Sequence, residues 1–248
     1  MDFQRQKTHR LQHVDLSRKG SIDALLQESV HFINSLPNYF TTSSCSGRII
    51  LFENTGSKVQ KKGCRWLHVT HNSVLKKDLE AALTDISDEA VLKFEPMVMH
   101  VQCRSLEDAR QMHQLAVASG FRNSGITVGS KGKIITAIRS THSLEVPLSS
   151  QGQVLVSPQH LDYLVDSANR KMEENTLRID RFRTSLQDLS PEASVKKCKS
   201  SHSQHVKETQ KHEGRLQSSD KPLPKHDMKN SGDSDDSDDL SLFIFDIT

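Results

Sequence analysis

Long apolar runs are absent from the 248-residue sequence. No stretch of about 18 apolar residues exists, which excludes a membrane-spanning helix and a membrane partner. The N-terminus has no apolar signal segment. The four cysteines show no paired spacing, which is typical of a reduced protein rather than a disulfide-stabilised secreted one. We therefore expect a cytoplasmic protein.

Hydrophobic residues are also scarce, at 34% of the chain, so part of it is expected to lack a core. The deficit lies in residues 191–248, where Lys, Ser, His, Gln and Asp dominate and periodicity is missing. We predict a folded domain over residues 1–190 and a disordered tail over residues 191–248. The tail begins as a basic linker, and residues 231–248 then hold six Asp and no Lys or Arg. This acidic end is a candidate site for a protein partner.

Strands and helices do not alternate regularly along the chain, which argues against a Rossmann-type sheet. The patterns predict one α+β domain with a mixed β-sheet, flanking helices and a long C-terminal helix. Expected helices cover residues 15–34, 73–84, 105–119 and 157–189. Expected strands cover residues 39–44, 48–53, 65–71, 90–103, 126–128, 133–139, 144–148 and 154–156. A bend at Cys45-Ser46-Gly47 separates the first two strands, and Glu95-Pro96 marks an edge, a bulge or a break in the strand over 90–103.

Glycine-rich nucleotide fingerprints are missing, because Gly129 to Gly132 forms a hairpin turn rather than a phosphate loop. A zinc site would need Cys64, His68 and His71, completed by Cys45 or Cys103. His68 and His71 are three residues apart on a strand, so their side chains point to opposite faces. We therefore predict no metal site.

Polar segments stand at several strand ends: "TTSSCSGR" at 41–48, "GFRNSGI" at 120–126 and "RSTHSLEVP" at 139–147. In the first, Gly47 permits close backbone approach, the hydroxyl groups donate hydrogen bonds, and Arg48 can clamp a carboxylate or phosphate. A serine-rich turn with an incidental thiol is the alternative interpretation. Because these segments end strands of one small domain, they are candidates to converge on a shared cleft.

Six motifs in order carry a specific resemblance over residues 15–185: "DLSRKGSID", "FTTSSCSGRI", "WLHVTH", "LKFEPMVMHVQCR", "SGFRNSGITVG" and "RSTHSLEVPL". They resemble the family of tRNA wybutosine-synthesizing protein 3. The resemblance implies an S-adenosylmethionine-dependent methyltransferase. Its substrate would be a ring nitrogen of the tricyclic modified base (7-aminocarboxypropyl-demethylwyosine) at guanosine 37 of phenylalanine tRNA.

With that activity in view, candidate residues can be assigned to three roles. The cofactor, and the aminocarboxypropyl group of the substrate base, would contact Ser43, Ser44, Ser46, Gly47, Arg48, Asn123, Ser124 and Gly125. The tRNA phosphates would contact Arg122, Lys131, Lys133, Arg139 and the basic end of the last helix. His100, His71 and Glu95 are the candidate proton acceptors, with His100 preferred.

Two other functions also fit the sequence. A non-catalytic protein that binds the tRNA anticodon loop for another modifying enzyme would use the same basic residues. A thiol-dependent enzyme would use Cys45 as its nucleophile. Under this interpretation, Cys45→Ala should abolish activity.

Overall fold

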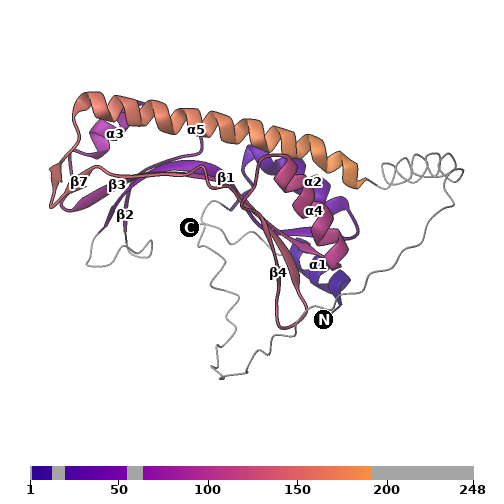
Figure 1. Ribbon diagram of the computed structural model, residues 1–248. Coiled ribbons are helices and arrows are strands. Elements are labelled where there is room, and N and C mark those ends of the chain that lie inside the picture. The colour runs from indigo at the N-terminus through magenta and orange to yellow at the C-terminus, as the bar shows by residue number, and fades with distance from the viewer. Residues whose placement is uncertain (1, 13–19, 55–63, 191–248) are drawn as a thin grey trace, which may run out of the picture. The chain divides into compact units, whose positions relative to one another are not determined.

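The computed structural model describes residues 2–12, 20–54 and 64–190, and its largest element is an antiparallel sheet (Figure 1). The strand order is β2-β1-β3-β5-β4, and β6 pairs with β3 as well. The strands are β1 (Tyr39–Asn54), β2 (Arg65–Thr70), β3 (Glu89–Cys103), β4 (Gly125–Val128), β5 (Ile134–Ile138) and β6 (Leu144–Pro147). A small second sheet pairs β7 (Ser149–Ser150) with β8 (Gln153–Val154). The predicted α+β class is confirmed, and the strand pairs run antiparallel where a mixed sheet was expected.

The two helices with the clearest sequence signals begin where they were predicted. Helix α4 (Leu106–Ala118) follows Ser105, which forms a capping box with Asp108. Helix α5 (Pro158–Ser185) follows Ser157, whose hydroxyl accepts a hydrogen bond from the His160 amide, and the turn η2 (Leu186–Leu189) extends it. The short helix α3 (Lys76–Ala82) lies within the predicted range 73–84.

The N-terminal helix prediction is only partly correct. Residues 15–19 of the predicted helix lie outside the described residues, and the structured part consists of the turn η1 (Ala24–Leu26) and helix α2 (Gln27–Ser35). Asp23 precedes η1 as its N-cap residue, and its side chain makes no cap hydrogen bond. Helix α1 (Phe3–Gln12) was not predicted at all. Its ring contact between Phe3 and Phe40, with centroids 5.4 Å apart, shows that tertiary packing supports it.

The predicted bend between the first two strands is wrong, because β1 runs through Cys45-Ser46-Gly47. Of the three alternatives predicted at Pro96, a break is wrong, because β3 runs through it. Gly47 and Pro96 are cross-strand partners. On its other edge β3 pairs with β6 over Val91–Phe94 and with β5 over Met99–Cys103, so neither strand pairs with Pro96. A proline is tolerated at a point where the ladder does not require its missing amide hydrogen.

A side chain from helix α5 holds the two strands together at this irregular point. Asn175 is completely buried, and its Nδ2 donates to the Ser46 carbonyl at 2.7 Å while its Oδ1 accepts from the Met97 amide at 2.8 Å. The amide thus satisfies a carbonyl of β1 and an amide of β3 at the same time. Gly47 has φ of +99°, and a Cβ there would lie 2.9 Å from Asn175 Nδ2, so only glycine fits without strain.

The two faces of the sheet have different environments (Figure 1). Ile49, Leu51, Leu92 and Phe94 face α5 and α3 and belong to the main core. The intervening residues point to the opposite face. There Ile50, Phe52 and Val91 form a smaller cluster against which Trp66 and Cys64 pack. We call this second side the open face of the sheet.

Two further sequence predictions concern membrane-spanning helices and the C-terminal tail. Among the residues that the structure describes, no helix is long and apolar enough to cross a membrane. The predicted disordered tail over residues 191–248 lies outside the described residues, so the division of the chain at residue 190 stays a prediction.

Candidate active site

The irregular point of β1 is also where polar side chains from distant segments meet. Ser46 donates its amide to the Asp23 carboxylate at 2.8 Å, and the Gly47 carbonyl lies 2.8 Å from His71 Nδ1. Strand β2 pairs with β1 over Ile49–Glu53, so these side chains bond to the backbone of β1 just beyond that ladder. We call Asp23, Cys45, Ser46, Gly47 and His71 the Gly47 cluster.

The hydrogen bond to Gly47 fixes the tautomer of His71. A carbonyl can only accept, so Nδ1 carries the proton and a neutral His71 ring has its lone pair on Nε2. Asp23 Oδ2 lies 3.6 Å from the same Nδ1. His71 also lines an open groove between η1 and α5, together with Leu25, Asn72, Asp166 and Glu173. The ring is thus oriented as a proton acceptor at the groove.

Cys45 is a buried thiol that lies close to two other potential metal ligands. Cys45 is 7% exposed, and burial raises the pKa of its thiol, which makes the nucleophilic thiolate scarce. Ligand atoms of Asp23, Cys45 and His71 lie within 4.8 Å of one another. The His71 Nδ1 and the Asp23 carboxylate already have backbone partners. The sequence prediction of no metal site stays a prediction.

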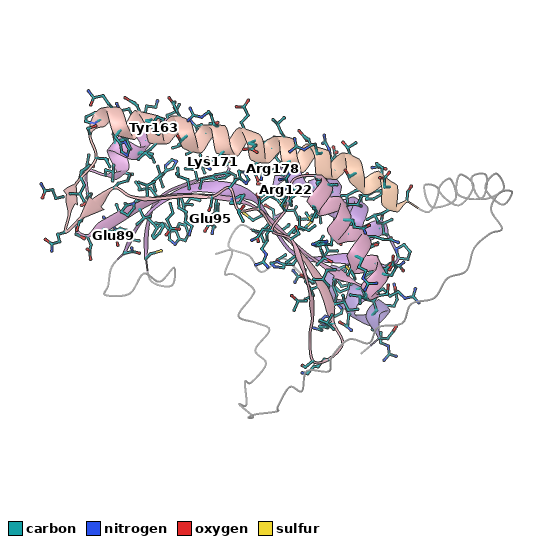
Figure 2. All side chains as sticks on the ribbon, in the orientation of Figure 1. Glu89, Glu95, Arg122, Tyr163, Lys171 and Arg178 are labelled. Atoms are coloured by element: carbon teal, nitrogen blue, oxygen red, sulfur yellow. The ribbon has the colours of Figure 1, made fainter. Side chains whose placement is uncertain are left out.

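Arg48 and Glu95 form an ion pair on the open face. They are cross-strand partners, with Arg48 Nε 2.9 Å from Glu95 Oε2, and their side chains are only 10% and 19% exposed. Lys93 continues the pattern, because its Nζ lies 3.8 Å from Glu95 and 2.8 Å from Glu145. Figure 2 shows Glu95 on the side of the sheet away from α5. We call Arg48, Glu95, Lys93 and Glu145 the ion-pair row.

Ser43 and His100, the preferred proton acceptor, form a second pair across the same strands. The Ser43 hydroxyl lies 2.9 Å from His100 Nδ1. Burial lowers the pKa of His100, and the positive charge of Arg139 lowers it further. His100 is therefore held in its neutral form, which is the form that accepts a proton.

The other predicted cofactor residues lie in the turn between α4 and β4. The Ser124 hydroxyl donates to the Phe121 carbonyl at 2.6 Å and accepts from the Arg139 amide at 3.2 Å. Asn123 is exposed, and Gly125 starts β4. Ser124 thus joins this turn to the segment after β5, rather than to the Gly47 cluster.

The four predicted tRNA contacts spread over this same end of the domain. Arg122, Lys131 and Lys133 are exposed. Arg139 is half-buried, and its Nε is a buried donor that has no hydrogen-bond partner among the described residues. A donor in that state is available to an incoming acceptor such as a phosphate oxygen.

Three residues of this region were not predicted as functional: Asp23, Trp66 and Asn175. Asp23 and Trp66 stand inside two of the motifs that carry the family resemblance, so a signal existed for them. Asn175 is an isolated polar residue within a long helical pattern. No local signal marks the bonds it makes to residues far away in the chain.

Comparison with known proteins first defines the class of protein that has this fold and site. The model of the family described as Methyltransferase TYW3 matches residues 4–188, which includes the Gly47 cluster and the ion-pair row. The chain belongs to this family of methyltransferases. The family resemblance drawn from the six motifs is thereby confirmed.

Individual relatives agree in sequence and in structure. The chain is 56% identical over 187 residues to the tRNA wybutosine-synthesizing protein 3 homolog of Danio rerio, covering 75% of this chain and 74% of that protein. It is 53% identical over 188 residues to the homolog of the same name from Bos taurus, covering 75% and 73%. The PH1069 protein of Pyrococcus horikoshii superposes with a TM-score of 0.69 at 33% identity, covering 75% of this chain and 96% of that one.

Proposed function

We propose that the protein uses S-adenosylmethionine to methylate a ring nitrogen of the tricyclic modified guanosine 37 in phenylalanine tRNA, a step of wybutosine synthesis. The observation that carries this proposal is the Gly47 cluster. Within a methyltransferase family, it brings a proton-accepting histidine and a buried carboxylate together at the groove beside α5. The relatives' names supply the pathway and the tRNA.

Bound S-adenosylmethionine supplies an already activated methyl group, so the protein must position the two reactants and remove one proton. His71 offers an Nε2 lone pair beside the groove, and His100 is held neutral next to Ser43. Either ring can accept the proton that the base loses. Arg48 and Glu95 cannot serve this purpose while they remain paired, so they are better suited to binding.

The ion-pair row fits the amino acid groups of both reactants. The methyl donor and the aminocarboxypropyl side chain of the base each end in an ammonium and a carboxylate. Arg48 and Lys93 alternate with Glu95 and Glu145 along the row, so cationic and anionic partners stand side by side. Such a row can bind a zwitterion without leaving a net charge unpaired.

The tRNA would approach over the end of the domain that carries Arg122, Lys131, Lys133 and Arg139. Phosphate contacts of this kind fix the register of an RNA and weaken as salt concentration rises. Base 37 lies in a loop, where a base can leave the stack at modest cost. We place this activity in the cytoplasm, supported by the buried thiols Cys45 and Cys103, and we keep the acidic end of the tail as a proposed protein-binding segment.

The test is transfer of labelled methyl from S-adenosylmethionine to tRNA isolated from cells that lack this step. We expect label in the tRNA, and in its base 37 after digestion to nucleosides. Unmodified tRNA transcript is the matched control and should remain unlabelled. A protein that shifts the tRNA on a gel but transfers no label would instead be the non-catalytic anticodon-loop binder.

A further inference from the structure

We infer that Trp66, together with Arg48, is the platform on which the tricyclic base stacks before methyl transfer. This inference rests on the proposed function and adds the residue that recognises the base. It concerns the open face of the sheet, where the ion-pair row is the part already proposed to bind amino acid groups.

Trp66 is held on the open face by packing on one side. It is the cross-strand partner of Phe52, with ring centroids 6.4 Å apart and planes at 47°. It packs against the cluster of Ile50, Phe52 and Val91, yet the residue itself is only half-buried. An indole ring that is fixed from beneath and accessible from outside loses little entropy when a planar ligand stacks on it.

Arg48 gives the platform its second component. The guanidinium carbon lies over the Trp66 ring, 5.3 Å from its centroid, within the roughly 6 Å of a cation–π contact. Its ion pair with Glu95 fixes its orientation. Indole rings and guanidinium planes are the groups on which unstacked RNA bases stack.

The platform adjoins the ion-pair row, because Arg48 belongs to both. Arg48 follows Gly47 in β1, so its side chain points to the face of the sheet opposite to that of Gly47. A base stacked on Trp66 and Arg48 would therefore place its aminocarboxypropyl group near the ion-pair row. If Trp66 has a purely structural role, the identity of base 37 should not change the fluorescence of the Trp66 ring.

The first experiment uses the unaltered protein, because Trp66 is the single tryptophan of the chain. Tryptophan fluorescence is titrated with three anticodon stem-loops that carry the demethylated tricyclic base, guanosine, or an abasic residue at position 37. We expect strong quenching by the first, weaker quenching by the second and little by the third. Equal quenching by all three would overturn the inference, because Trp66 would then report contact with the RNA backbone.

The second experiment compares Trp66→Leu with Trp66→Phe. Loss of a base–aromatic stack weakens binding by about tenfold to a hundredfold, so Trp66→Leu should raise the Kd of the tricyclic stem-loop by that factor. Its affinity for the abasic stem-loop should remain unchanged, and Trp66→Phe should recover most of the loss. If a folded Trp66→Leu protein binds the tricyclic stem-loop as the wild type does, the inference is wrong.

Tyr163→Leu is the matched control. Tyr163 is also an exposed aromatic residue beside an arginine, with the Arg170 guanidinium 6.0 Å from its ring, but it lies on α5 (Figure 2). This substitution should leave both affinities unchanged. Should Trp66→Leu fail to fold, the wild-type titration and Trp66→Phe still decide the question.

The two proposals fail in different ways. Absence of methyl transfer by the wild type would contradict the proposed function, whereas the fluorescence titration reads base stacking without any turnover. Methyl transfer combined with base-independent fluorescence would contradict the platform alone.

Discussion

The two halves of β1 belong to one strand but satisfy their backbone groups in different ways. Residues Ile49–Glu53 are paired with β2 on one edge and with β3 on the other, and apolar side chains cover both faces. At Ser46 and Gly47 the partners are instead side chains of Asp23, His71 and Asn175. The paired residues Ile49–Glu53 contribute to the core, whereas the side chains bonded to Ser46 and Gly47 form the Gly47 cluster.

The comparison shows how a regular strand gathers polar side chains at one point. Buried backbone groups must find hydrogen-bond partners. Where the ladder ends, polar side chains supply those bonds, and the same bonds hold the side chains in a fixed orientation. The His71 ring is thereby held in place at the groove.

The largest expected effect comes from Gly47→Ala, which would remove the irregular point itself. The added Cβ would lie 2.9 Å from both Asn175 Nδ2 and the Glu95 carbonyl, at φ of +99°. Strain and overpacking together should lower the free energy of unfolding by at least about 3 kcal/mol. Gly132→Ala is the control, because Gly132 has φ of +75° with nothing within 4 Å. Denaturant unfolding should show that Gly132→Ala lowers the free energy of unfolding by only about 1 kcal/mol. Equal losses in the two variants would refute the crowding argument.

Asp23→Asn should separate the charge in the Gly47 cluster from its hydrogen bond. An amide oxygen can still accept from the Ser46 amide, so the free energy of unfolding should change by less than about 1 kcal/mol. The negative charge 3.6 Å from His71 Nδ1 is lost, and methyl transfer should fall by about a hundredfold. Single-turnover transfer of labelled methyl measures this effect. An Asp23→Asn enzyme with normal turnover would leave Asp23 with a purely structural role.

Sequence patterns were sufficient where local rules decide the structure. Ser105 and Ser157-Pro158 mark the starts of α4 and α5 through capping chemistry that acts over three residues. The family motifs likewise indicated Arg48, His71 and His100, although the role of each stays a prediction.

Sequence patterns failed where a distant residue decides. A Gly47 bend and a Pro96 break are reasonable local expectations, and both strands continue because Asn175 bridges them from a helix 129 residues after Ser46. The bonds from Asp23 to Ser46 and from His71 to Gly47 also join segments more than 20 residues apart. No periodicity or spacing encodes such contacts, so they become visible only in the folded chain.

Arg48→Ala tests the ion-pair row, which belongs to the same half of the strand. We expect methyl transfer to fall at least about tenfold, because a charge-assisted contact with a carboxylate is lost. The fold should persist, since Glu95 retains Lys93 at 3.8 Å. The KM for S-adenosylmethionine and the KM for tRNA, measured separately, show which amino acid group Arg48 binds. Kinetics close to those of the wild type would remove Arg48 from the site.

The smallest effect concerns His100 and pH. Its pKa lies below the ordinary 6.5 because the ring is buried and faces Arg139, so in mildly acidic solution the unfolded chain binds a proton that the folded chain does not. The free energy of unfolding should therefore decrease as pH falls from about 7 to about 5, and His100→Gln should show a weaker decrease. If His100 is also the proton acceptor, the acidic limb of the methyl-transfer rate lies below pH 6.5 and vanishes in this variant. The exposed His160, changed to Gln, serves as the control and should preserve both profiles. An acidic limb that persists in His100→Gln would assign the proton acceptor to His71 instead.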